Sequence, residues 1–145
     1  MSAQPGDSAP LAPEFVDAIN ESIQDEYYAL FTYTRVVTDF GDVQPFSIIR
    51  LAEMRHSAAV GGLFTKRGLE IPGSEWDESN VPTFAFFLAA CIGGKESETA
   101  NIAMYDRLLS TPELPSDVRN VFTNLRAASL EQHLPAFERC INRGT

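Results

Sequence analysis

The chain has 145 residues, enough for one domain with its own hydrophobic core. Eleven basic residues against twenty acidic ones give a net charge of -9, so the surface repels nucleic acid and anionic membranes. The most apolar run, Phe84 to Gly94, is about half as long as the roughly 20 residues of a membrane-spanning helix. We expect no nucleic-acid partner and no membrane association. No secretory signal is visible, so we expect a cytoplasmic protein.

Helix start and stop signals divide the first half of the chain. Residues 1–12, rich in Ser, Pro, Gly and Ala, are predicted to be a disordered tail before a single domain over 13–145. A proline in the first turn and a later glycine–proline turn predict one helix over 13–39 and a second over 45–68. The segment 69–82 has the Pro, Gly, Ser and acidic content of a loop.

The second half is predicted to hold two further helices. One covers 83–110, with Gly93 and Gly94 as a weak point, and the other runs from Ser116, a candidate N-cap, to Asn142. No segment shows strand alternation, so the predicted class is all-α. The first and last connections are short, whereas the middle loop of about 14 residues reaches roughly 45 Å when extended. We therefore predict two antiparallel hairpins joined by a long crossover, although this loop also permits a plain up-and-down bundle.

Acidic and histidine side chains stand inside the apolar stripes of these helices. They are Glu26 in the first, Glu53 and His56 in the second, Glu98 in the third and His133 in the fourth. A buried carboxylate is costly unless it is neutralised, paired or bound to metal, and few basic residues share the stripes. Glu53 and His56 are three residues apart and project from one helix face. Mixed Glu and His ligands suit iron, manganese or zinc better than magnesium or calcium.

Each of these residues also has a simpler interpretation. The Glu53–His56 spacing is common by chance, His133 alone fits a hydrogen-bonded core histidine, and Glu98 would be a surface acid if its helix broke. Joint placement on all four stripes favours a metal site. Two aromatic residues near these positions, Tyr33 and Tyr105, are interpreted as core, because aromatic residues at helical spacing usually are. The alternative is that they stand beside the metals as hydrogen-bond donors or radical sites.

The same residues resemble the ferritin-like superfamily, which includes rubrerythrins and ferritins. Its pattern is a Glu on helix one, Glu-x-x-His on helix two, a Glu on helix three and Glu-x-x-His on helix four. Glu26, the run Glu53-Met54-Arg55-His56, and Glu98 match the first three elements. The sequence around these residues resembles that of a bacterial and archaeal subgroup without a settled function. The resemblance covers nearly the whole chain, from about 13 to 139.

The fourth helix departs from that pattern. Leu130 stands three residues before His133, where the family has Glu. Glu131 is two residues before the histidine, about 200° round the helix, and should face elsewhere unless the break at Pro135 re-aims it or opens a path to solvent. The expected metal ligands are Glu26, Glu53, His56, Glu98 and His133. An asymmetric dinuclear site and a single-metal site both remain open.

The resemblance implies a ferritin-like four-helix bundle that binds iron, expected as two ions, with manganese or zinc as other choices. It implies a non-haem iron oxidoreductase, ferroxidase or peroxidase-like, that reacts with dioxygen or hydrogen peroxide and takes electrons from an unspecified donor, with Glu53 bridging the ions. Two alternatives remain: a non-catalytic metal-binding or storage protein, and a metal-free helical interaction module. A homodimer is expected by analogy only.

The two cysteines are too few for a disulfide scaffold. Cys91 lies seven residues before Glu98, and Cys140 lies seven residues after His133, so antiparallel helices would place them at one height, roughly 10 Å from the metal. One hypothesis is that they approach each other as a redox pair or a softer metal site. The preferred interpretation is two inert buried thiols, because free cysteine behaves as a small apolar residue.

Overall fold

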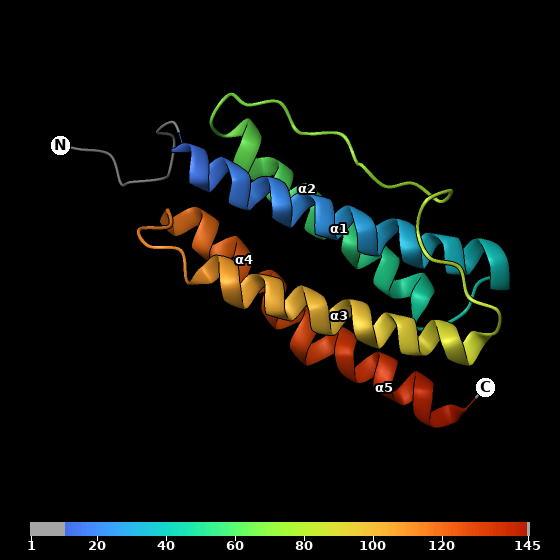
Figure 1. Ribbon diagram of the computed structural model, residues 1–145. Coiled ribbons are helices and arrows are strands. Elements are labelled where there is room, and N and C mark those ends of the chain that lie inside the picture. The colour runs from blue at the N-terminus through green and yellow to red at the C-terminus, as the bar shows by residue number, and fades with distance from the viewer. Residues whose placement is uncertain (1–10, 145) are drawn as a thin grey trace.

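The computed structural model describes residues 11–144 (Figure 1). The helical elements are α1 (Pro13–Phe40), α2 (Phe46–Thr65), α3 (Phe87–Leu109), α4 (Ser116–Ala128), the π-helical turn η1 (Ser129–His133) and α5 (Leu134–Arg143). No strand occurs within 11–144, so the all-α prediction is confirmed. No helix in this range has the length and apolarity needed to cross a bilayer. The predicted tail lies outside the described residues as far as residue 10.

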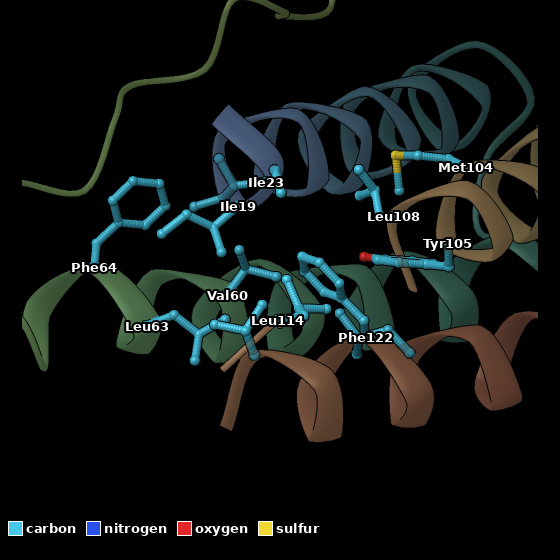
Figure 2. Close-up of a cluster of buried hydrophobic side chains, with 13 residues drawn as sticks. Ile19, Ile23, Val60, Leu63, Phe64, Met104, Tyr105, Leu108, Leu114 and Phe122 are labelled. Atoms are coloured by element: carbon cyan, nitrogen blue, oxygen red, sulfur yellow. The ribbon is translucent and has the colours of Figure 1, made fainter. Parts of the chain in front are cut away.

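One apolar cluster fills the end of the molecule where α1 begins and α2 ends (Figure 2). We call it the Ile19 cluster. Its buried members come from α1, α2, α3, α4 and the turn before α4: Ala18, Ile19, Ile23, Val60, Leu63, Phe64, Met104, Tyr105, Leu108, Leu114, Val118, Phe122 and Leu125. Leu11, just before α1, also packs against it. Helical spacing on each element places these side chains on one face, which is why they meet.

A second cluster occupies the opposite end, where α1 ends and α2 begins. We call it the Phe46 cluster: Ala29, Tyr33, Val36, Phe46, Ile49, Ala90, Cys91, Phe137 and Cys140. The rings of Tyr33, Phe46 and Phe137 lie with centroids 5.2 to 5.7 Å apart. The order of the two clusters along the chain shows that α2 and α3 run in one direction, while α1 and the α4–α5 run go the other way.

The connection between α2 and α3, residues 66–86, lies along α1 (Figure 1). The Gln24 side chain donates a 2.9 Å hydrogen bond to the Gly73 carbonyl. Farther along α1, Arg35 donates a 2.8 Å hydrogen bond to the Glu78 carbonyl. The chain thus advances along α1 as it proceeds, and this return places the start of α3 beside the start of α2.

The start of α3 at Phe87 comes four residues after the predicted Thr83. Phe86 is extended, and the ring of Phe84 folds back onto α3 over Gly93. A methyl group at Gly93 would collide with that ring, so the glycine permits the close approach.

The predicted weak point at Gly93 and Gly94 is wrong, because α3 passes through both residues unbroken. A methyl group at Gly94 would collide with the ring of Phe137 from α5. The two glycines therefore serve helix packing, since small residues let a neighbouring element approach closely.

The predicted helix from Ser116 to Asn142 forms, but it contains the π-helical turn η1. The Leu134 N–H bonds to the carbonyl of Ser129, five residues back, instead of four. Pro135, in the first turn of α5, has no N–H to donate, so the regular ladder has to be interrupted near this point. The extra residue in the turn leaves both Ser129 and His133 buried, whereas Leu130 is 41% exposed.

Candidate metal centre

The five side chains expected as metal ligands come together between the two apolar clusters. Glu26 is on α1, Glu53 and His56 on α2, Glu98 on α3 and His133 at the end of η1. The three carboxylates are 1 to 2% exposed and His133 is 4% exposed, while His56 is partly buried. They form two groups whose ligand atoms lie within 4.8 Å of one another: Glu26, Glu53 and His56; and Glu53, Glu98 and His133. Glu53 belongs to both.

The first group joins α1 and α2. His56 Nδ1 lies 3.2 Å from Glu26 Oε1 and 3.6 Å from Glu53 Oε1. The second Glu26 oxygen, Oε2, accepts a 2.6 Å hydrogen bond from the Tyr105 hydroxyl of α3. One face of the Glu26 carboxylate is therefore held by a neutral donor, and the other face is turned to the imidazole.

The second group has the same design on α3 and η1. His133 Nδ1 lies 3.2 Å from Glu98 Oε1 and 3.2 Å from Glu53 Oε1. The second Glu98 oxygen accepts a 2.5 Å hydrogen bond from the Tyr33 hydroxyl of α1. Tyr33 and Tyr105 each stand seven residues after the glutamate of their own helix and bind the glutamate of the other helix. Their interpretation as core residues is confirmed by their burial, and both also donate the hydrogen bonds that the alternative interpretation allowed.

Glu53 lies at the centre of the arrangement. Its Oε1 atom is buried and accepts no hydrogen bond from residues 11–144, although both imidazoles are near. Burial, followed by the negative charges of Glu26 and Glu98, raises the pKa of Glu53 well above its ordinary value. Burial also opposes ionisation of Glu26, but hydrogen bonding and attraction to His56 outweigh it and lower the Glu26 pKa. A buried carboxyl oxygen without a partner, facing two imidazoles, is the environment that a cation would stabilise.

Glu131 lies outside the site, as its spacing from His133 predicts, and Ser129 of η1 lies at the edge of the site. Leu130 and Glu131 are both exposed, so Glu131 stays outside the site. Ser129 is buried instead, and its hydroxyl donates a 2.8 Å hydrogen bond to Asn101 Oδ1. The Asn101 amide donates to Glu26 Oε2 at 3.0 Å and to Asp25 Oδ2 at 2.7 Å. A neutral hydrogen-bonded chain therefore closes this edge of the site.

Sequence reasoning missed this chain of contacts. Asn101 stands three residues after Glu98 on the same face of α3, which is a signal that helical spacing offers. Ser129 stands four residues before His133, a spacing that also shares a helix face, so the same signal was available for it.

Asp25 connects the centre to the molecular surface. Burial raises its pKa to about 6, against the opposing effect of the Asn101 hydrogen bond. It lines a surface groove of about 620 Å³ together with the acidic residues Asp17, Glu21 and Glu75. A concentration of negative charge in a groove raises the local concentration of cations.

A disulfide bond joins Cys91 of α3 to Cys140 of α5 inside the Phe46 cluster. The two Cα atoms are 5.7 Å apart, and both residues are fully buried. The interpretation as inert thiols is wrong, and the hypothesis that the pair approaches is confirmed. The reason is the antiparallel packing of α3 on α5, which brings the two residues to one height.

Comparisons with known proteins support the fold and give no information about the chemistry of the site. No family model matches the chain, and no curated protein sequence matches it. A solved structure does: the crystal structure of hypothetical protein MJ0754 from Methanococcus jannaschii DSM 2661 has a TM-score of 0.81 and 23% sequence identity. The match covers 99% of this chain and 87% of that one. At this identity the similarity establishes a shared all-helical fold alone.

Proposed function

We propose that this chain is a ferritin-like four-helix bundle, with a crossover between α2 and α3, that binds two transition-metal ions. Glu26, Glu53 and His56 hold one ion; Glu53, Glu98 and His133 hold the other, with Glu53 as the shared ligand. The observation that carries the proposal is the buried Oε1 of Glu53, which accepts no hydrogen bond from any described residue and lies close to the Nδ1 atoms of both imidazoles. Paired glutamates and histidines from facing helices are a known way to build metal sites in bundle cores.

The charge and the ligand types favour iron, with manganese or zinc as competitors. Three carboxylates and two neutral imidazoles leave two divalent ions with one net positive charge. The higher oxidation state of iron is better compensated by carboxylates than by neutral ligands. We infer a non-haem iron protein that reacts with dioxygen or hydrogen peroxide and receives electrons from an external reductant.

The iron would supply the redox chemistry, and the chain's own residues would keep its ligands in place. Tyr33 and Tyr105 fix the carboxylates of Glu98 and Glu26 by hydrogen bonds to their outer oxygens. Burial raises the pKa of both phenols well above 10, so they remain neutral donors. Glu53 loses its proton when a cation arrives, because the cation offsets the charges that raise its pKa.

Metal stoichiometry tests the proposal. Protein purified without chelators, and then titrated anaerobically with ferrous ion, should bind two ions per chain. Variants Glu26→Ala and Glu98→Ala should each bind one ion, because each leaves one group intact. The exposed Glu131→Ala is the matched control and should bind two.

Optical monitoring of the same ferrous-loaded sample on exposure to air tests the redox part. Oxidation faster than that of free ferrous ion, lost in Glu53→Ala, supports the oxidoreductase. Two bound ions without accelerated oxidation would instead indicate storage or non-catalytic binding. Failure of the wild-type chain to bind any of iron, manganese or zinc would refute the metal centre.

A further inference from the structure

A cavity of about 390 Å³ opens between α2 and the η1–α5 run, on the side of the metal centre away from α1. Its wall combines apolar side chains from α2 and α5 with three arginines, and it includes the proposed ligand His133. The volume falls in the range of small-molecule sites. Ile48 at this cavity is 63% exposed, so its side chain is available to an apolar ligand.

The charge of this cavity is opposite to that of the rest of the molecule. Arg55, Arg139 and Arg143 line it, whereas no carboxylate from the described part of the chain does. Within residues 11–144 none of the three guanidinium groups has an ion-pair or hydrogen-bond partner. In a chain with eleven basic and twenty acidic residues, three unpaired arginines around one apolar cavity indicate an anionic ligand.

His133 links the cavity to the metal centre. Its Nδ1 is turned to Glu53 and Glu98, and its other ring nitrogen, Nε2, makes no hydrogen bond to any residue of the described range. A metal-ligating histidine normally donates its second ring N–H to a carboxylate, a carbonyl or water. A ligand carboxylate in the cavity would supply that partner and would offset the positive charge left on the two ions.

We propose that this cavity binds a small organic acid, a monocarboxylate with an apolar body, beside the metal centre. The carboxylate pairs with the arginines, and the apolar body lies on Ile48, Ile49 and Ala136. The cavity stands on its own observations; only the claim that the acid adjoins a metal rests on the proposed function. A second copy of the chain fits less well, because a two-fold interface through this face would bring arginine clusters together without acids.

Calorimetric titration with octanoate tests the site in metal-free protein, with octanamide as the neutral comparison. Octanoate should bind saturably and at least about tenfold more tightly than octanamide. The double variant Arg139→Gln, Arg143→Gln should lose that tenfold difference, while octanamide binding stays unchanged. In the matched control Arg107→Gln, the arginine of α3 that pairs with Glu21 of α1 loses its charge, and this variant should bind octanoate like wild type.

A second variant distinguishes loss of octanoate binding from loss of folding. Ile48→Glu alters an exposed side chain, so the helix content in circular dichroism should be unchanged, and the added negative charge should weaken octanoate binding about tenfold. Absence of saturable binding, equal binding of octanoate and octanamide, or equal octanoate affinity in the arginine variant would each overturn the proposal. So would a dimer through this face that octanoate does not dissociate.

Cobalt(II) separates this inference from the proposed function. If octanoate shifts the visible absorption of cobalt-loaded protein, the acid adjoins the metal. If octanoate binds but cobalt does not, the anion site stands and the metal function fails. If both bind and the spectrum does not change, the link between cavity and centre is wrong.

Discussion

The two halves of the candidate centre use one set of contacts in two different settings. Each half has a glutamate held by a tyrosine from the facing helix, a histidine, and a share of Glu53. The half of Glu26 and His56 lies on regular helices, and its tyrosine belongs to the Ile19 cluster. The half of Glu98 and His133 depends on a π-helical turn, and its tyrosine belongs to the cluster with the disulfide.

This difference teaches which features hold a buried ligand in place. His56 is presented by an unbroken helix three residues after Glu53, so local geometry alone aims it. His133 has no such glutamate before it, and its position relies on η1, on Phe137 against Gly94, and on the Cys91–Cys140 bond. We therefore expect the second half to be the more sensitive to changes in packing.

Glu53→Gln should have the largest effect, because it removes the ligand that both halves share. We expect both ions to be lost, with affinity at each position lowered roughly 100-fold or more. Metal content by elemental analysis after dialysis measures this. The control Glu131→Gln makes the same change at an exposed glutamate, and this variant should retain both ions. Loss of only one ion in Glu53→Gln would show that the halves do not share it.

Removal of the disulfide should have the next largest effect, and it should weaken metal binding only in the half of Glu98 and His133. Cys91 and Cys140 are 49 residues apart, so the double serine variant should lose about 4 kcal/mol in free energy of unfolding. Urea denaturation measures the loss, and thiol titration of the aerobic wild type should find no free thiol. The ion at Glu98 and His133 should bind more weakly, while that at Glu26 and His56 should not. Equal weakening of metal binding at both positions would contradict the expectation that the Glu98 and His133 half is the more sensitive to packing.

The two tyrosines allow a matched test of the halves. Tyr33→Phe removes the donor to Glu98 and Tyr105→Phe removes the donor to Glu26, each without loss of ring volume. Each should weaken one ion about tenfold, because contacts that support a ligand contribute to affinity on this scale. Competition titration with a coloured chelator resolves the two sites. If both variants weaken the same ion, the crossed assignment of tyrosines to halves is wrong.

Asp25→Asn should have the smallest effect on metal binding, because Asp25 belongs to neither group of candidate ligands. Its effect on stability is specific to the Glu26 half, since the residue before Glu98 is the neutral Ser97. Burial raises the folded pKa of Asp25 from 3.8 to about 6, so its ionisation opposes folding. The wild type should therefore lose stability relative to the variant as pH rises from 3.8 to about 6. At neutral pH the metal-free variant should be about 3 kcal/mol more stable. Urea denaturation of both proteins at pH 4 and pH 7 measures the difference in their free energies of unfolding. This difference should be nearly absent at pH 4.

The helix order and the five interior polar side chains could be predicted from the sequence. Helical spacing fixes which residues share a face, and a carboxylate on an apolar face is visible without coordinates. Glu26, Glu53 and Glu98 were found by that reasoning. The boundary at Phe87 was missed because Phe84 folds back on Gly93, which is a contact between residues nine apart in sequence.

The remaining features depend on how the helices are rotated and shifted against one another, and periodicity within one helix carries no such information. The crossed tyrosine contacts and the arginine-lined cavity arise between elements distant in sequence. The bond between Cys91 and Cys140 does too, and their equal offsets from Glu98 and His133 led only to a hypothesis that the two approach. The π-helical turn belongs with them, because one added residue changes which side chains of η1 face the interior. Local spacing therefore placed the ligands on their helices, whereas packing between helices built their surroundings.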